Sequence, residues 1–434
     1  KQATVSTRLR FVNLDIDWLT AHANLEKWTL HTEHRQDLPM SILQRFDRMG
    51  LDCTSLEDRK TFCAHSAAGE FLSDQAMHEI YSRPGSHFAA VDQCPKSLLH
   101  CGGGGLIGGA HHQVRQARAG VPTDSNISLE AGIYKGKLPR HLVAAHRPIR
   151  MTSPIPRGES NRAKSLQQDT MEVTGAYTPE VFAYRAEISG LFMALVTRAA
   201  ITASLQDYGV AELADWDESD AFFRNQRDQV SALSQVFPGV WDPGEWCQRY
   251  FGRLEVRPLT SDGLAPPFVT GEGFNQGDDY SGDGYQLGCA VVNAALPVPT
   301  EVCIPPRAAG LLSPMGPRVP VNMTSFSDDR RFIAATRIVL MTLIALCIRA
   351  TKSKGGIIHH GKMDFFQIIL RRGVPTLHEA PVEEFDTVTS KAAPIVVGVP
   401  VMHQLGFGDK LTRIVSKMRT LKAKYGRDEV SVPL

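Results

Sequence analysis

The chain has 434 residues, of which 43% are hydrophobic, so it is long and apolar enough for a real core and is not intrinsically disordered. Its 47 Lys and Arg nearly balance its 46 Asp and Glu, which excludes a general attraction to nucleic acid or to anionic lipid. Its eight cysteines form no CxxC pair, a pattern typical of reduced thiols and not of a secreted disulfide framework.

The chain begins at Lys1 without an initiator Met and without an apolar signal core. We therefore expect a processed chain, a fragment, or the ordered part of a longer protein.

Residues 1–150 form an irregular, histidine-rich region with short helical patterns such as Met40 to Met49. Eleven of the fifteen histidines lie in this region: His22, His31, His34, His65, His78, His87, His100, His111, His112, His141 and His146. Many loops are expected here.

A glycine-rich motif follows within this region, Gly103-x-Gly105-x-x-Gly108, with Asp124 placed where a ribose-binding acid would stand in a dinucleotide site. Six glycines in eight positions match the motif by chance, and no βαβ alternation surrounds it. The interpretation favoured here is a flexible or tightly turning loop.

Six nearby residues are candidate zinc ligands, but their spacing is irregular and lacks the close pairs of a structural zinc site. They are His87, Cys94, His100, Cys101, His111 and His112. His31-x-x-His34 lacks the glutamate of a metalloprotease motif, and no GxSxG nucleophile motif occurs. Ordinary packed or exposed histidines are therefore expected, with no metal and no cofactor.

Residues 151–176 are polar and rich in turn formers, which predicts an exposed connector or surface excursion. A cap and a first-turn proline then predict a long helix from Thr178 to Tyr208. A second helix is predicted from Asp217 to Phe237, ending at Pro238-Gly239.

Residues 252–324 are rich in Gly and Pro, which predicts an extended segment that runs along the surface of other elements. Within it, Asp278, Asp279, Ser281 and Asp283 resemble a calcium loop, but Ala290 stands where an EF-hand needs Glu. A mobile acidic loop is the interpretation favoured here.

The strongest single pattern is Ser327 to Gly356, which predicts one long core helix. Ser327 can cap it, Asp328 and Asp329 suit its positive end, and Gly355-Gly356 can end it. Its apolar run is too short for the roughly 20 residues of a membrane span. Because the run is apolar nearly all round, we expect protein to surround it.

A buried strand is predicted from Ala393 to Met402 and a last helix from Asp409 to Tyr425, while His359-His360-Gly-Lys362 is interpreted as an ordinary loop. The last helix presents the only concentrated basic surface, which predicts contact with RNA phosphates or an acidic neighbour, against the alternative of a solvated helix face. Its candidate contact residues are Lys410, Arg413, Lys417, Arg419, Lys422, Lys424 and Arg427.

The predicted fold class is α+β and predominantly α-helical, a large irregular body with small β elements and long Pro/Gly-rich connections. Three regions are expected: the histidine-rich residues 1–150, the connector 151–176, and a helical body over residues 177–434. The helical body includes the extended segment 252–324 and the basic helix 409–425, and all of these could be one domain.

In its general texture, chiefly Thr178 to Phe237, Pro297 to Pro320 and Ser327 to Gly356, the chain resembles the capsid proteins of fungal double-stranded-RNA viruses of the totivirus, chrysovirus and quadrivirus type. The resemblance implies a self-assembling shell subunit that encloses a double-stranded RNA genome. Some members of that family also remove messenger caps through a histidine, for which no residue of this chain is assigned, so a non-enzymatic role is favoured and the question of an enzymatic activity stays open. It implies as partners other copies of the chain or a related capsid subunit, the RNA and a viral RNA polymerase, with no membrane. It also implies a place in the virion, assembled in the host cytoplasm.

Two other function classes stay open from the sequence. One is a metal- or nucleotide-dependent enzyme with its site in residues 87–146. The other is a nonenzymatic scaffold subunit of a cellular complex.

Overall fold

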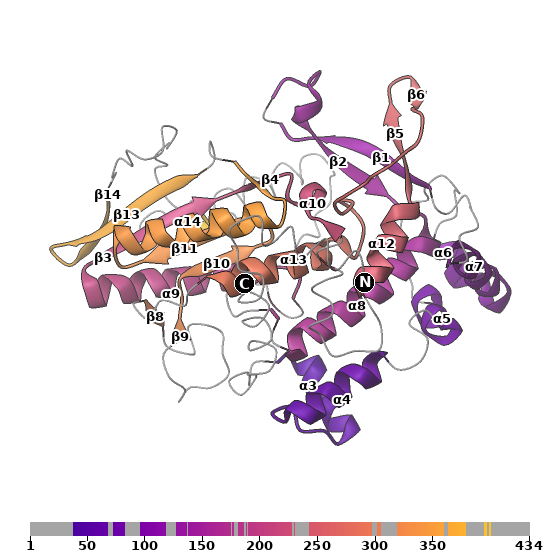
Figure 1. Ribbon diagram of the computed structural model, residues 1–434, viewed down its shortest axis with the longest axis horizontal. Helices are drawn as coiled ribbons and strands as arrows, with labels where there is room; N and C mark the ends of the chain where they lie inside the picture. Colours follow the sequence, from indigo (N-terminus) through magenta and orange to yellow (C-terminus); the bar gives the residue numbers. More distant parts are fainter. Residues whose placement is uncertain are drawn as a thin grey trace, which may run out of the picture.

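The computed structural model describes residues 38–67, 73–82, 96–118, 127–136, 138–174, 176–177, 181–185, 188, 190–227, 230, 243–296, 302–304, 319–359, 363–378, 395–396 and 399–400. Two five-stranded sheets with helices packed around them organise this part of the chain (Figure 1). The prediction of a predominantly helical protein with only small β elements is therefore wrong, and the fold is mixed α and β.

The central sheet has the strand order β10-β11-β3-β13-β14, and each neighbouring pair is antiparallel. Its strands are β3 (Val210–Trp216), β10 (Met323–Phe326), β11 (Asp329–Ala334), β13 (Asp364–Arg371) and β14 (Val374–His378). Helix α9 (Gly190–Tyr208) packs with Leu213, Ile333 and Phe366 on one face. Helix α14 (Arg337–Ser353) packs with Ala214, Phe332 and Phe365 on the other. The alternating faces of the strands thus supply two apolar cores, one under each helix.

Helix α14 is the apolar helix that the sequence predicted, but it starts ten residues later than predicted, at Arg337. Its cap is Thr336, whose hydroxyl accepts a hydrogen bond from the backbone N–H of Val339. Ser327, with a φ of 62°, instead lies in the turn between β10 and β11. At the other end Gly355 has a φ of 84°, in agreement with the predicted glycine stop. Among the described residues no helix has both the length and the hydropathy of a membrane span.

The second sheet has the order β2-β1-β5-β6, and β7 also pairs with β5. It consists of β1 (Ile127–Tyr134), β2 (His146–Met151), β5 (Glu255–Thr260), β6 (Gly263–Leu264) and β7 (Phe268–Val269). Figure 1 shows β1, β2, β5 and β6 standing above α12 (Pro243–Arg253), away from the central sheet. We call this element the projecting sheet.

Residues 151–176 are not an exposed connector, because they contain the 21-residue helix α8 (Pro154–Thr174). Many of its polar side chains are buried and partnered. Glu172, for example, receives both Nε and Nη2 of Arg185 at 2.8 Å. The polar composition therefore reflects internal hydrogen bonds and ion pairs, which a hydropathy pattern cannot distinguish from solvent contact.

The two helices predicted on either side of β3 differ from the structure in their described parts. The described part of the first is α9, which begins at Gly190, and the predicted start at Thr178 lies outside the described residues. In place of the start of the second lie β4 (Glu218–Ser219) and the single turn α10 (Ala221–Arg224). β4 pairs with β12 (Ile357–Ile358) directly after α14.

The segment 252–324 is not extended throughout, because it contains helix α13 (Ser281–Ala295), which packs against α14. Three glycines let other segments approach α13 closely: a Cβ at Gly282, Gly284 or Gly288 would lie within 2.4 to 2.7 Å of Tyr184, Phe274 or Asn225 respectively. The glycines that suggested a loop are thus required inside a buried helix.

The remaining described elements are the helices of the first part of the chain and two pairs of short strands. The predicted helix Met40 to Met49 is confirmed as α3 (Met40–Met49). It is followed by α4 (Leu56–Ala67), α5 (Asp74–Ser82), α6 (Lys96–Cys101), α7 (Gly103–Arg118) and the short 3-10 helix η3 (Val143–Ala145). β8 (Cys303–Ile304) pairs with β9 (Val319–Pro320), and β15 (Ile395–Val396) pairs with β16 (Val399–Pro400). In place of the single predicted strand Ala393 to Met402, the described residues form two short antiparallel strands.

Candidate functional site

The seven basic residues singled out from the sequence, Lys410 to Arg427, lie outside the described residues, as does the helix predicted to carry them. Asp124, His87, Cys94, His31, His34, His360 and Lys362 lie outside them as well. The RNA-contact prediction thus stays a prediction.

The glycine-rich motif is not a loop, because Gly103, Gly105 and Gly108 lie within the helix α7. A dinucleotide site needs these glycines in the turn between a strand and a helix, where the backbone approaches the pyrophosphate. The element before α7 is the helix α6, not a strand. The loop interpretation is therefore corrected, and the glycines match no dinucleotide fingerprint.

Two of the candidate histidines, His100 and His111, have separate partners. His100 directs Nδ1 to the carbonyl of Ser82 at 2.5 Å, and His111 lies 3.3 Å from Asp74. Burial lowers the pKa of His111, which favours its neutral form. Across the described part of the chain, no three His, Cys, Asp or Glu side chains form a group able to hold a metal ion. The seven described cysteines are free thiols.

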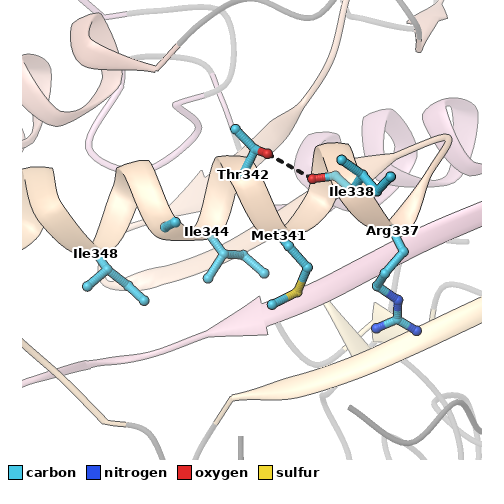
Figure 2. A pocket seen from close by; sticks show the side chains of 7 residues that line it. Arg337, Ile338, Met341, Thr342, Ile344 and Ile348 are labelled. Carbon is cyan, nitrogen blue, oxygen red and sulfur yellow. Dashed lines mark hydrogen bonds between the residues drawn. The ribbon is translucent and has the colours of Figure 1, made fainter. Parts of the chain in front are cut away.

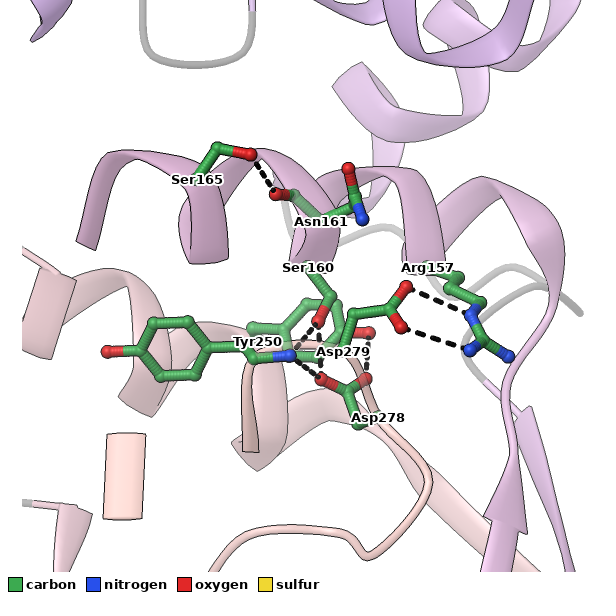
Figure 3. Close-up of polar contacts among 8 residues, drawn as sticks. Arg157, Ser160, Asn161, Ser165, Tyr250, Asp278 and Asp279 are labelled. Atoms are coloured by element: carbon green, nitrogen blue, oxygen red, sulfur yellow. Dashed lines mark hydrogen bonds and ion pairs between the residues drawn. The ribbon is translucent and has the colours of Figure 1, made fainter. Parts of the chain in front are cut away.

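The acidic segment around Asp278 forms a buried junction between helices (Figure 3). Asp278 accepts hydrogen bonds from the hydroxyl of Ser160 on α8, from Tyr250 on α12 at 2.9 Å, and from the backbone N–H of Tyr280 at 3.0 Å. Asp279 forms a two-point ion pair with Arg157 at 2.9 and 3.0 Å. The junction therefore ties α8, α12 and the start of α13 together.

Burial raises the pKa of two carboxyl groups in this region. The pKa of Asp278 rises to about 6, and that of Asp283 rises to about 7, while Tyr177 donates a hydrogen bond to Asp283 at 2.8 Å. Both side chains are buried in the described structure. We infer a role in holding the helices together, and the prediction of a mobile acidic loop is wrong.

These two carboxyl groups predict a pH-dependent stability. Each binds its proton more tightly in the folded chain than in the unfolded chain, where the pKa is near 3.8. Their contribution is therefore fully present below about pH 4 and is lost as the pH rises through about 6 to 7. Asp283→Asn should show a shallower fall of the unfolding free energy between pH 4 and 7 in urea titrations. Equal slopes in the wild type and Asp283→Asn, with the exposed Asp262→Asn as control, would contradict it.

The projecting sheet has one side that is apolar and open. Residues paired in register lie on the same side of a sheet, and successive residues alternate between its two sides. One side carries Ser128, Arg150 and Val256, which are buried toward the body. The opposite side has no buried residue. We call this opposite side the sheet face; it consists of Ile127, Leu129, Ala131, Ile133, Arg147, Ile149, Met151, Glu255, Arg257, Leu259, Leu264 and Val269.

Four apolar residues of the sheet face are strongly exposed. Ile133 is 56% exposed, and Leu259, Leu264 and Val269 are each about half exposed. They come from β1, β5, β6 and β7, so the pairing of four strands brings them to one surface. A contiguous apolar surface of this kind marks an interaction site more often than a scattered exposed side chain does.

A second apolar surface lies on α14, where a groove of about 510 Å³ is lined, among the described residues, by side chains of this helix (Figure 2). We call it the α14 groove; its lining is Arg337, Ile338, Met341, Thr342, Ile344, Ala345 and Ile348. Two of its polar side chains already have partners within the chain. The Thr342 hydroxyl donates to the carbonyl of Ile338 at 2.9 Å, and Arg337 forms an ion pair with Glu212 at 3.2 Å. The other side chains that line the groove are apolar, so the groove is suited to contact with another apolar surface.

No known protein family matches the chain, and no curated protein matches it significantly. Function is therefore argued from the two surfaces themselves. Sequence reasoning missed both of them, although the period-two alternation of Ile127, Leu129, Ala131 and Ile133 is a strand signal that could have located the first.

Proposed function

We propose that the chain is a structural subunit that assembles with copies of itself into a closed shell. The observation that carries the proposal is the sheet face, a surface of five strands with no buried residue and with large exposed apolar side chains. Burial of apolar area is the main favourable term in association between proteins, so such a surface favours a permanent contact.

The α14 groove supports a shell in preference to a simple dimer. A dimer needs one contact surface, whereas each subunit of a closed shell contacts neighbours on several sides. The groove and the sheet face lie on different elements, α14 against the central sheet and the projecting sheet above α12 (Figure 1).

Helix α14 adds a second argument. Its sequence is apolar nearly all round, which is typical of a helix surrounded by protein. Ile338 is nevertheless 80% exposed, and Thr342 and Ala345 are exposed on the same side. A neighbouring subunit over the groove would complete the burial that the sequence implies.

The cargo in this proposal is a double-stranded RNA genome with its polymerase, as the resemblance to coat proteins of fungal double-stranded-RNA viruses implies. The formal net charge of +1 supports this choice over single-stranded RNA, because a shell that surrounds a duplex does not have to condense it by bulk charge. The location proposed is accordingly the virion.

Sedimentation velocity of the full chain at low and high salt tests the proposal. Large species are expected at both salt concentrations, because contacts between apolar surfaces are not screened by ions as contacts between exposed charges are. A chain that sediments as a monomer at every protein and salt concentration would contradict self-assembly.

A further inference from the structure

The loop that joins β1 to β2 lies at the outer end of the projecting sheet (Figure 1). Every described residue from 132 to 144 is exposed. We call residues 134–136 and 138–144, which include η3, the hairpin tip. Val143 of the hairpin tip is 91% exposed, and three further large side chains are 38 to 45% exposed: Tyr134, Leu138 and Leu142. Apolar side chains grouped at the end of an arm are available to a partner and mark an interaction site.

The charge around the hairpin tip has one sign. Between Glu130 and Glu159 the sequence holds no Asp or Glu, whereas it holds six cations: Lys135, Lys137, Arg140, Arg147, Arg150 and Arg157. Lys135 and Arg140 are exposed in the hairpin tip, and neither forms an ion pair with another described residue. A partner that fits the hairpin tip must therefore offer negative charge and apolar contact together.

Contacts within the hairpin order its tip before any partner binds. The hydroxyl of Tyr134 donates a hydrogen bond to the carbonyl of Leu138 at 2.7 Å. Nδ1 of His146 lies 3.1 Å from the carbonyl oxygen of Leu142. Because these contacts fix the loop, it presents Leu138, Leu142 and Val143 in one arrangement, which lowers the entropy cost of binding.

A nucleic acid fits the hairpin tip less well than a lipid surface does. Residues 131–149 include no Ser, Thr, Asn or Gln, the neutral side chains that hydrogen-bond to sugars and bases. The ring of Tyr134 is already covered by the guanidinium of Arg140, 4.9 Å from the ring centroid, and is not free to stack on a base. The exposed Val143 has no apolar partner along a phosphate backbone.

We propose that the hairpin tip binds an anionic lipid surface. Leu138, Leu142 and Val143 enter the apolar layer below the headgroups, while Lys135 and Arg140 contact the lipid phosphates. A bilayer offers phosphates and hydrocarbon at adjacent depths, which is the combination that the hairpin tip requires. This contact goes beyond the proposed shell and does not depend on it, and the resemblance to coat proteins does not imply it. In an assembled shell it requires the hairpin tip to lie on the outer surface.

Flotation of the full chain with lipid vesicles tests the proposal. The probes are vesicles of phosphatidylcholine and phosphatidylserine in equal amounts, and vesicles of phosphatidylcholine alone. The wild type should bind the anionic vesicles about tenfold more tightly or better, because each Lys or Arg near an anionic surface contributes about fivefold in affinity. A double-stranded RNA fragment serves as the competing probe.

Two variants of the hairpin tip separate its apolar and charged contributions. Val143→Asp should lower the affinity for anionic vesicles by about tenfold or more, because a carboxylate is unfavourable in the apolar layer. Val143→Leu should bind as the wild type does. Lys135→Gln with Arg140→Gln should lower the affinity by about twentyfold. All three side chains are exposed, so circular dichroism should match the wild type.

Matched changes far from the hairpin tip are the controls. Met40 is 58% exposed on α3, which lies far from the hairpin tip in Figure 1, so Met40→Asp should leave vesicle binding unchanged. Arg48→Gln with Lys60→Gln, on α3 and α4, is the control for the pair of charges and should also have no effect.

The outcomes distinguish this contact from the proposed function. Wild-type protein that binds no anionic vesicles, or that binds both kinds of vesicle equally, overturns the lipid contact. Val143→Asp that binds anionic vesicles as the wild type does also overturns it. Variants of the hairpin tip that lose RNA binding and keep vesicle binding would identify a nucleic acid as the partner instead. Wild-type protein that stays monomeric yet binds anionic vesicles through the hairpin tip overturns the shell and supports the lipid contact.

Discussion

Replacing Lys354 by Met is expected to lower the free energy of unfolding by about 3 to 5 kcal/mol, the range for breaking one side of a buried ion pair. The Nζ of Lys354 lies 2.5 Å from Oε1 of Glu218, and both side chains are 1% exposed. Tyr285 donates a hydrogen bond to the other carboxylate oxygen at 2.9 Å. Without Lys354 the buried Glu218 loses its countercharge. Urea unfolding followed by circular dichroism measures the change.

Lys352→Met is the matched control, because Lys352 is exposed on the same last turn of α14. It should change the unfolding free energy by less than about 0.5 kcal/mol. Adding Glu218→Gln to Lys354→Met should recover part of the loss, since the uncompensated charge is then removed. A Lys354→Met protein as stable as the control would show that the pair does not hold β4 to the end of α14.

Replacing Leu259 and Leu264 together by Asp is expected to prevent assembly while the monomer stays folded. The two residues are cross-strand neighbours and are each about half exposed, so water solvates the new charges in the monomer. In an assembled contact the same carboxylates would be buried without partners, which is strongly unfavourable. Light scattering and electron microscopy should show no large species, and circular dichroism should match the wild type.

Val143→Asp is the control for this pair. Val143 is 91% exposed and belongs to the same projecting element, but it lies in η3 between β1 and β2 and not on the sheet face. Its replacement should leave assembly unchanged. Loss of assembly in Val143→Asp, or normal assembly in the Leu259 and Leu264 variant, would contradict the assignment of the sheet face as a contact.

The sequence predicted an element correctly where the residues of that element alone determine its pattern. The apolar run of α14 predicted a core helix, and Gly355 marked its end. Its start was misplaced because Ser327 and the following acids look like a cap, while the chain there makes the turn of a hairpin. The buried Arg331 pairs with Asp215 on β3, a tertiary contact that local propensity cannot reveal.

The two largest errors share another cause. α8 looks polar and α13 looks like a loop, yet both are buried. Burial of Glu172 depends on Arg185, and burial of Gly284 depends on the close approach of Phe274 and Tyr280. Composition gives the residue types but not their contact partners. Helices that pack through ion pairs and glycines therefore cannot be predicted from composition.

The candidate surfaces could not be read from the sequence for a geometric reason. The sheet face collects residues from β1 and from β5 to β7, which are more than 100 positions apart in the chain, through the parallel pairing of β1 with β5. Exposure of Ile338 likewise depends on which side of α14 the other elements leave open. The alternation along β1 predicts a strand, but only the fold shows that its apolar side faces outward.

Electron microscopy of the protein from its native source tests the central claim most directly. Closed particles built from this chain, with double-stranded RNA protected inside them from nuclease, are the predicted result. Protein recovered only as monomers or small open oligomers, with no protected RNA, would contradict the proposal that the chain is a shell subunit.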